Sequence, residues 1–299
     1  MTKPFPSSPY LAKNGRMPSS RSMHVTPLGD IASFTPSVQR PVRIRARAMP
    51  ADSHFEPHHH AWAQLAYCAT GIVKVTAQQR AIGRDQVTYI VPPSRAVWIA
   101  PGAQHAITVI EAADFCTLYI DPSVVPTGWR GCRVMVVSAL MRELIHALDA
   151  PLNAPLISPW VQARENMIVP LLLHEITHAT TQALGVPMPN PQSGDKRLRA
   201  LCEAVLRAPG ERATLSDWAA DIGASERTVA RLFRTELGTS YQQWRQQAVL
   251  AHALPLLARG TPVSHVAAAS GYASDSAFSA MFKAAMGQPP SQFMDKNLL

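Results

Sequence analysis

The sequence predicts an α+β protein with a β-barrel or sandwich in its first half and an all-helical domain at its end. Between about residues 42 and 120, short runs of β-branched and aromatic residues alternate with Pro, Gly and Asp, which is typical of many short strands. From about residue 134 onward, apolar residues recur instead at helical spacing. A chain of 299 residues is long enough for two such domains.

Composition narrows the class of protein. Hydrophobic residues make up 47% of the chain, enough for two cores, and no apolar run approaches the roughly 18 residues that cross a membrane. The four cysteines are far apart and form no CxxC pair, so we expect neither a disulfide framework nor a cysteine zinc site. No signal peptide opens the sequence. These features favour a cytoplasmic protein with no membrane partner.

Residues 1–37 are rich in Pro, Ser and basic residues and have no apolar periodicity, which predicts a disordered basic tail. Its charges either add nonspecific phosphate contacts or are simply solvated. Much of the net charge of +8 lies towards the N-terminus, because residues 1–47 hold eight Lys and Arg against one Asp. Residues 195–299 hold twelve against nine acidic residues, so any DNA-binding role of that domain must be argued from pattern rather than charge.

We expect the barrel at residues 38–130. His58, His60 and Gln64 are separated by even numbers of residues, so one strand would point all three to the same face, and His105 follows a Pro-Gly turn. Three imidazoles and an amide oxygen can bind a divalent metal such as Zn²⁺. Alternatively, the histidines line a metal-free pocket for an organic effector, which the neutral Gln64 favours.

The two stretches His58-x-His60-x3-Gln64-x6-Gly71 and Pro101-Gly102-x2-His105 resemble the two motifs of the cupin barrel, in which Glu usually stands at the position of Gln64. The resemblance implies a cupin-like sensor with a central pocket. The residues expected to line the pocket are His58, His60, Gln64, His105, Trp62, Tyr67 and Trp98. The three histidines are the candidate metal ligands.

A helical region for dimerisation and linkage is expected at residues 131–190. An apolar stripe from Val137 to Leu148 predicts one helix, and residues 162–182 predict a second, interrupted by Pro170. Residues 185–196 are rich in Pro, Gly, Asn and Ser and predict an interdomain linker.

The second of these helices contains His174-Glu175-Ile176-Thr177-His178, which matches the HExxH zinc-peptidase motif. The motif fixes only three positions, and no HxxGxxH element follows to supply a third ligand. We interpret the match as chance.

Residues 191–299 predict an all-helical domain with two helix-turn-helix units. In the first unit Gly223 ends a helix, Ser225 can cap the next one, and Phe233 is among its inward residues. In the second unit Gly271 and Ser274 have the same two roles. A stiff helix over about residues 240–258 would hold the two reading helices roughly 34 Å apart, in successive major grooves.

The outward faces of these two reading helices carry the candidate DNA contacts. They are Glu226, Arg227, Thr228, Arg231 and Arg234 in the first unit, and Ser274, Ser276, Ser279 and Lys283 in the second. Arg227 or Arg231 can bind guanine O6 and N7 in bidentate fashion, and Lys283 suits a phosphate. The second helix has few long side chains, so the first unit is expected to carry most base readout.

The C-terminal pattern resembles the DNA-binding domain of the AraC/XylS family of bacterial transcription regulators over about 100 residues. The second unit follows the family signature through Gly271-Tyr272-x-Ser274-x-Ser276-x-Phe278-x3-Phe282-Lys283-x3-Gly287-x2-Pro290, and the first fits it less completely. Val249 departs from the family, which usually has Arg in this part of the connecting helix.

The resemblance implies a regulator that binds a double-stranded DNA operator under the control of a small-molecule effector or metal. It also implies a homodimer paired through the central helices, and RNA polymerase as a partner if the protein activates transcription. No enzymatic activity is expected. The alternative is a metal-dependent cupin enzyme, such as a dioxygenase, with a helical appendage; Gln64 and the two complete helix-turn-helix units weigh against it.

Overall fold

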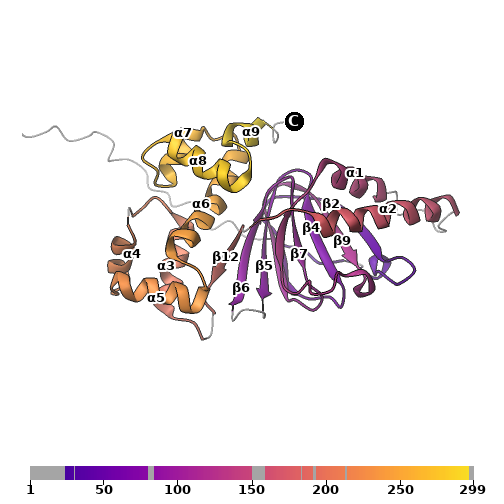
Figure 1. The fold of residues 1–299 in the computed structure, drawn as a ribbon, viewed down its shortest axis with the longest axis horizontal. Coiled ribbons are helices and arrows are strands. Elements are labelled where there is room, and N and C mark those ends of the chain that lie inside the picture. Colours follow the sequence, from indigo (N-terminus) through magenta and orange to yellow (C-terminus); the bar gives the residue numbers. More distant parts are fainter. Residues whose placement is uncertain are drawn as a thin grey trace, which may run out of the picture.

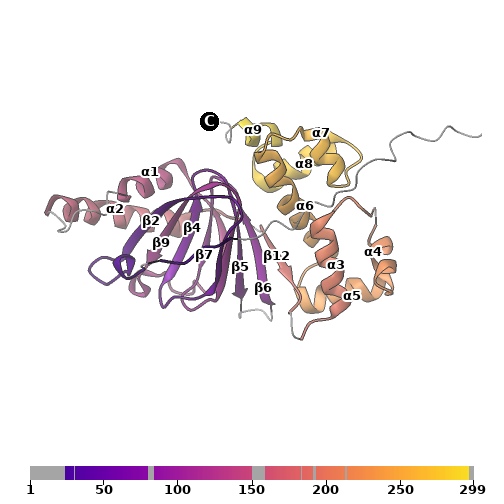
Figure 2. The ribbon, with the colours of Figure 1, turned by 180° about the vertical axis from the view of Figure 1, so that it is seen from behind.

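A computed structural model describes residues 24–29, 31–79, 84–149, 159–182, 184–190, 193–212 and 214–295. The part of the predicted tail before residue 24 lies outside these ranges. An N-terminal β-barrel lies beside a C-terminal helical domain (Figure 1), and the reverse view in Figure 2 shows the same arrangement. The predicted α+β fold class is confirmed. Across the described ranges, no helix is long and apolar enough to cross a membrane.

The barrel is built from two sheets packed face to face. One has the strand order β1-β3-β8-β5-β6-β12 and the other β11-β10-β7-β4-β9-β2. The strands are β1 (His24–Val25), β2 (Val42–Met49), β3 (Ser53–His58), β4 (Ala63–Cys68), β5 (Ile72–Gln79), β6 (Arg84–Val91), β7 (Arg95–Ile99), β8 (His105–Glu111), β9 (Ala113–Ile120), β10 (Arg133–Val136), β11 (Thr181–Gln182) and β12 (Gly185–Met188).

Two helices cover the outer face of the second sheet. They are α1 (Ala139–Leu148), capped by the Ser138 hydroxyl, and α2 (Pro159–His178), which continues through Pro170. Their apolar stripes pack on the outward side chains of β2, β4, β7 and β9. All residues of β4 are therefore buried, because one face points into the barrel and the other lies under the helices.

Two segments predicted to lack regular structure form strands. Within the predicted tail, β1 pairs in parallel with β3, and residues 32–34 form a short 3-10 helix. Within the predicted linker, β12 pairs antiparallel with β6, from Gly185 opposite Tyr89 to Met188 opposite Gln86. The second helix ends at His178 rather than at residue 182, because Thr181 and Gln182 pair with β10. Each strand gains backbone hydrogen bonds from a distant partner, which local composition does not reveal.

The helical domain has the two predicted helix-turn-helix units at either end of a long helix. The helices are α3 (Lys196–Arg207), α4 (Leu215–Asp221), α5 (Glu226–Leu237), α6 (Tyr241–Ala258), α7 (Val263–Ala269), α8 (Asp275–Met286) and α9 (Pro290–Asp295). Figure 1 shows α4 and α5 near one end of α6 and α7 and α8 near the other. Val249 is fully buried in α6, so an apolar residue suits the position where the family usually has Arg.

The helical domain is joined to the barrel by polar contacts as well as by β12. The indole Nε1 of Trp244 donates to the Pro187 carbonyl at 2.7 Å. The buried Arg95 guanidinium on β7 donates to the Met286 carbonyl, at the end of α8, at 2.9 Å. Arg259, just after α6, forms an ion pair with Glu111 at the end of β8. The barrel therefore contacts the second helix-turn-helix unit directly.

Candidate DNA-binding surface and effector pocket

The first candidate reading helix, α5, is held firmly by its N-terminal cap and by its buried face. Ser225 caps it by accepting from the Thr228 backbone N–H at 3.2 Å. Its Phe233 is fully buried, with ring centroids 5.3 Å from both Tyr241 and Trp244. The C-terminal half of α5 therefore has a rigid aromatic support on α6.

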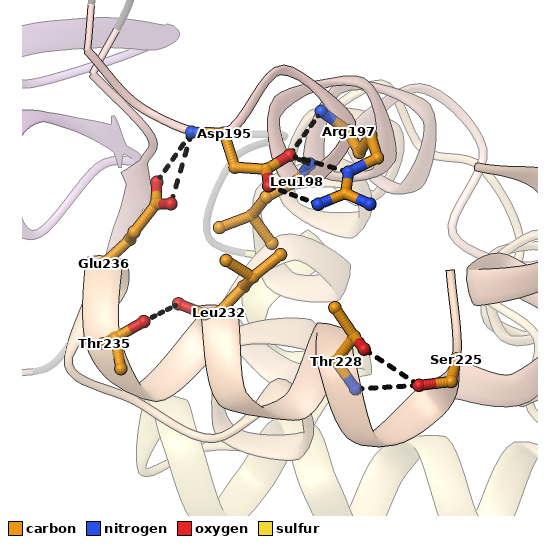
Figure 3. A network of polar contacts seen from close by, with 8 residues as sticks. All are labelled: Asp195, Arg197, Leu198, Ser225, Thr228, Leu232, Thr235 and Glu236. Carbon is orange, nitrogen blue, oxygen red and sulfur yellow. Dashed lines mark hydrogen bonds and ion pairs between the residues drawn. The ribbon is translucent and has the colours of Figure 1, made fainter. Parts of the chain in front are cut away.

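A second set of polar contacts ties α5 to α3 (Figure 3). Glu236 accepts from the Asp195 backbone N–H at 3.2 Å and 3.1 Å, and Asp195 in turn caps α3. The side-chain hydrogen bond from Arg197 lowers the pKa of Asp195 to about 2, so this cap stays ionised at neutral pH.

The outward face of α5 is basic and available. Arg227, Arg231 and Arg234 are exposed, and no carboxylate pairs with them in the described part of the chain. Glu226 is exposed at the first turn. Thr228 is half-buried, and its hydroxyl is bonded to that of Ser225 at 2.9 Å, so it is less available for DNA than the arginines. The three arginines are thus the side chains of this face most able to reach DNA.

The second candidate reading helix, α8, offers shorter side chains. Ser274 is its cap, and Ser276 donates to the Ser274 hydroxyl at 3.3 Å. Ser279 is half-buried, whereas Lys283 is exposed in the last turn. This surface can contact phosphates and supplies little for reading base edges.

The three predicted histidines come together, although not for the predicted reason. His58 ends β3 and His105 begins β8, but His60 lies in the connection between β3 and β4 and not on a strand. Gln64 lies on β4, so the prediction that one strand carries His58, His60 and Gln64 was wrong. The ring centroids of His58 and His105 lie 4.3 Å apart, and those of His60 lie 5.0 Å and 5.5 Å from them.

Burial keeps these imidazoles neutral at neutral pH. It lowers the pKa of His105 to about 3 and that of His60 to about 4, and it lowers the pKa of His58 as well. A neutral His105 must donate from Nδ1 to the Ala103 carbonyl, at 2.9 Å, which leaves Nε2 as an acceptor. The Gln64 amide lies 3.1 Å from this Nε2, so its NH₂ group rather than its oxygen must face the ring.

The donor set fits a divalent transition metal. One nitrogen from each of His58, His60 and His105 lies within 4.8 Å of the others, and the three rings are in the neutral form that binds metals. The Nε2 of His60 is buried without a hydrogen-bond partner in the described residues. The same arrangement also suits a metal-free effector, whose polar group could occupy that position.

Next to His58 and Gln64, the barrel interior forms a small pocket with a cavity volume of about 20 Å³. Its walls include Arg45 and Arg47 from β2, Phe55 from β3, and Phe115 and Tyr119 from β9. None of these residues was predicted. The alternation in the run VRIRARA was the available signal, since a strand places its arginines on one face and its apolar residues on the other.

Two aromatic residues expected in the pocket lie elsewhere, and one belongs to the cluster. Tyr67 and Trp98 are buried under α1 and α2, on the outer face of the sheet. Tyr67 is three residues from the inward-facing Gln64, so the strand must point it the other way. Trp62 stacks on His60, with ring centroids 5.1 Å apart and planes 6° apart.

The HExxH residues on α2 have structural roles. Glu175 accepts from the Ser138 hydroxyl at 2.7 Å, and His178 bonds through Nδ1 to the His174 carbonyl at 2.9 Å. Among the described residues, the one group of three or more potential metal ligands is the barrel histidine cluster. A third ligand near His174 and His178 is therefore not found in that part of the chain.

Comparisons with known proteins agree with this architecture. A helix-turn-helix domain family matches residues 218–296, and the AraC-like ligand binding domain family matches residues 40–158. The chain is 34% identical over 239 residues to the HTH-type transcriptional regulator NimR of Escherichia coli, covering 79% of this chain and 81% of NimR. It is 32% identical over 108 residues to the HTH-type transcriptional regulator RipA of Corynebacterium glutamicum, covering 36% of this chain and 32% of RipA.

Among solved structures, ToxT from Vibrio cholerae aligns with 86% of this chain and 98% of its own, at 11% identity and a TM-score of 0.35. The assignment depends on the sequence matches, which cover both domains. With an AraC-like ligand-binding domain preceding two helix-turn-helix units, the chain belongs to the AraC family of DNA-binding transcription regulators.

Proposed function

We propose that this regulator recognises its operator mainly through α5 and that an effector in the barrel controls the binding. The observation that carries the proposal is the outward row of Arg227, Arg231 and Arg234, exposed and without carboxylate partners in the described chain, on a helix fixed by its cap and by Phe233. Arg227 and Arg231 are suited to guanine, and Arg234 and Lys283 to phosphates.

The proposed effector site is the barrel interior with His58, His60, His105 and Gln64 at its base and Trp62 beside them. Regulator family membership favours this role over a metal-dependent enzyme. We favour a metal-free pocket, because the amide of Gln64 replaces the carboxylate that would strengthen a hard-metal site. Metal analysis of the purified protein tests this choice, since stoichiometric zinc or iron in the wild type and its loss in His60→Ala would establish a metal site.

The function is tested by a genome-wide map of bound DNA, followed by binding measurements on the operator it defines. His60→Ala should keep operator affinity, because α5 packs in a hydrophobic core separate from that of the barrel strands, and should lose the effector response. The neighbouring genes guide the choice of effector. A His60→Ala variant that responds like the wild type would show that the effector site lies elsewhere.

We further propose a cytoplasmic homodimer paired through α2. Trp160, Met167 and Leu171 are 68%, 71% and 43% exposed. Their spacing of seven and four residues places them in one stripe along the helix, on the side away from the barrel. A second copy of the chain is the occupant we infer, since two such stripes are self-complementary. RNA polymerase becomes a further partner if the regulator activates transcription.

A further inference from the structure

Two cations in the barrel converge on one oxygen atom. β2 places Arg45 and Arg47 on its inner face, two residues apart. Nη1 of Arg45 lies 2.7 Å from the Leu28 carbonyl oxygen, and Nη2 of Arg47 lies 2.5 Å from the same atom. Two guanidinium groups therefore donate to a single acceptor atom at this position in the barrel.

The Leu28 carbonyl does not neutralise the positive charge of Arg45 and Arg47. A carbonyl is neutral, and no carboxylate within the described ranges pairs with either guanidinium. Burial and then the charge of Arg45 lower the pKa of Arg47, so this guanidinium is partly desolvated beside a second cation. Desolvated like charges are costly unless an anion accompanies them, so the site is electrostatically incomplete.

The rest of the pocket is largely apolar on its walls. Phe55, Ile107 and Phe115 line it alongside the Tyr119 ring. Arg47 already lies over the Phe55 ring, 5.5 Å from its centroid. A ligand held here must therefore combine a negative end near the arginines with a short apolar body against the phenyl rings.

We propose that the effector is a small organic carboxylate whose charged group binds Arg45 and Arg47. This inference rests on the proposed function, because it assigns a chemical class to the ligand of the same pocket. The carboxylate takes the position that the Leu28 carbonyl occupies, and its two oxygens each accept from one guanidinium. Leu28 lies at the pocket wall in the segment of residues 24–29, so its displacement opens more room for the body of the ligand.

Calorimetric titration of the full chain tests the proposal with two acids, hexanoate and phenylacetate, and their uncharged amides, hexanamide and phenylacetamide. We expect at least one acid to bind the wild type, and its amide to bind at least about tenfold more weakly, because the amide lacks the charge that the arginines recognise. Arg45→Met and Arg47→Met should each weaken binding of the acid by about tenfold or more.

Arg43→Met is the matched control. Arg43 is on the same strand and face, also donates to a backbone carbonyl (that of Ser33, at 3.0 Å), and does not line the pocket. Its substitution should change the affinity less than twofold. Thermal unfolding of each variant checks the fold, and the comparison of acid with amide on the wild type needs no variant at all.

Three results would overturn the carboxylate assignment: no binding of either acid at 10 mM (about the weakest affinity that the titration detects), amides that bind as tightly as the acids, or equal losses in the Arg43 and Arg47 variants. A regulator that still binds its operator and responds to another effector would then keep the proposed function. Conversely, acids that bind through Arg45 and Arg47 without changing operator affinity would support the pocket chemistry and contradict effector control.

Discussion

At the scale of single residues, Arg231 is the side chain on which specificity should depend most. It is exposed near the middle of α5, one turn beyond Arg227. Arg231→Ala should cost about 1–3 kcal/mol of operator binding and relax the preference at one base position, because a bidentate contact to guanine is lost. Fluorescence anisotropy on the operator and on single-base variants measures both effects.

Lys283→Ala is the comparison for that measurement. Its charge lies at the last turn of α8 and should contact a phosphate, so its loss should weaken all sequences alike and reduce the salt slope by about one unit. An Arg231→Ala protein with unchanged affinity and unchanged base preference would contradict the assignment of α5 as the reading helix.

Residue-level prediction succeeded where the signal was local and failed where it depended on register. The caps Ser225 and Ser274 are at the predicted positions, because capping depends on a residue and its next three neighbours. Tyr67 and Trp98 were placed in the pocket without a strand register and lie on the other face. The pocket arginines carry a readable alternation, but the Leu28 carbonyl that joins them is 17 and 19 residues away in sequence.

At the scale of elements, α2 makes the proposed homodimer testable. Met167→Glu places a charge in the exposed apolar stripe and should convert the dimer to a monomer, because burying an unpaired carboxylate in an interface is costly. Light scattering of the full chain measures the mass. Asn166→Glu is the control: this residue is exposed on α2 but about 100° around the helix from Met167, so the variant should remain a dimer. Equal masses for the two variants would argue against this interface.

The strand β12 makes a second element-level prediction. Val186 is fully buried in the core of the helical domain, and the Pro187 carbonyl accepts from the buried Trp244 indole. A fragment of residues 184–299 should therefore be more stable than one of residues 191–299. The difference in the free energy of unfolding should be about 2–5 kcal/mol, because the shorter fragment loses the burial of Val186 and leaves the Trp244 indole without its acceptor. Urea unfolding followed by tryptophan fluorescence compares them. Equal stabilities would show that β12 belongs energetically to the barrel alone.

The elements themselves were predicted unevenly, for a physical reason. The helices of the C-terminal domain have caps, glycine stops and apolar stripes within their own sequence, so their existence and order were readable. β1 and β12 contain Pro, Gly or polar residues and exist because a distant strand edge was available to pair with them. Composition alone assigned them to a tail and a linker.

At the scale of the whole molecule, Arg95 and Arg259 join the two domains with unequal strength. Arg95 is 5% exposed and satisfies the Met286 carbonyl, whereas Arg259 is in a partly exposed ion pair with Glu111. Arg95→Met should destabilise the chain by about 1–3 kcal/mol, because a buried carbonyl loses its donor. Arg259→Ala should cost about 0–1 kcal/mol. Denaturant unfolding measures the two costs.

Hydrogen exchange locates the effect. In Arg95→Met the last turn of α8 should exchange faster, while α5 should be unchanged, since its polar contacts come from α3. If both helices loosen together, the contact stabilises the domain as a unit and not α8 in particular.

The double membership of β12 also limits how such regulators can be recombined. A hybrid that joins the sensor of one protein to the helices of another must choose a crossover point near residues 184–196. If the junction follows Met188, β12 comes from the sensor parent, and its residue at position 186 must pack in the helical core of the other parent. If the junction precedes Gly185, β12 comes from the helical parent and must pair with the β6 strand of the other parent. Either junction therefore changes one of the contacts of β12. Working chimeras should be sought among parents whose β12 residues fit both the β6 strand and the α6 helix of the hybrid. A longer connection between the domains should not rescue a pair that does not fit.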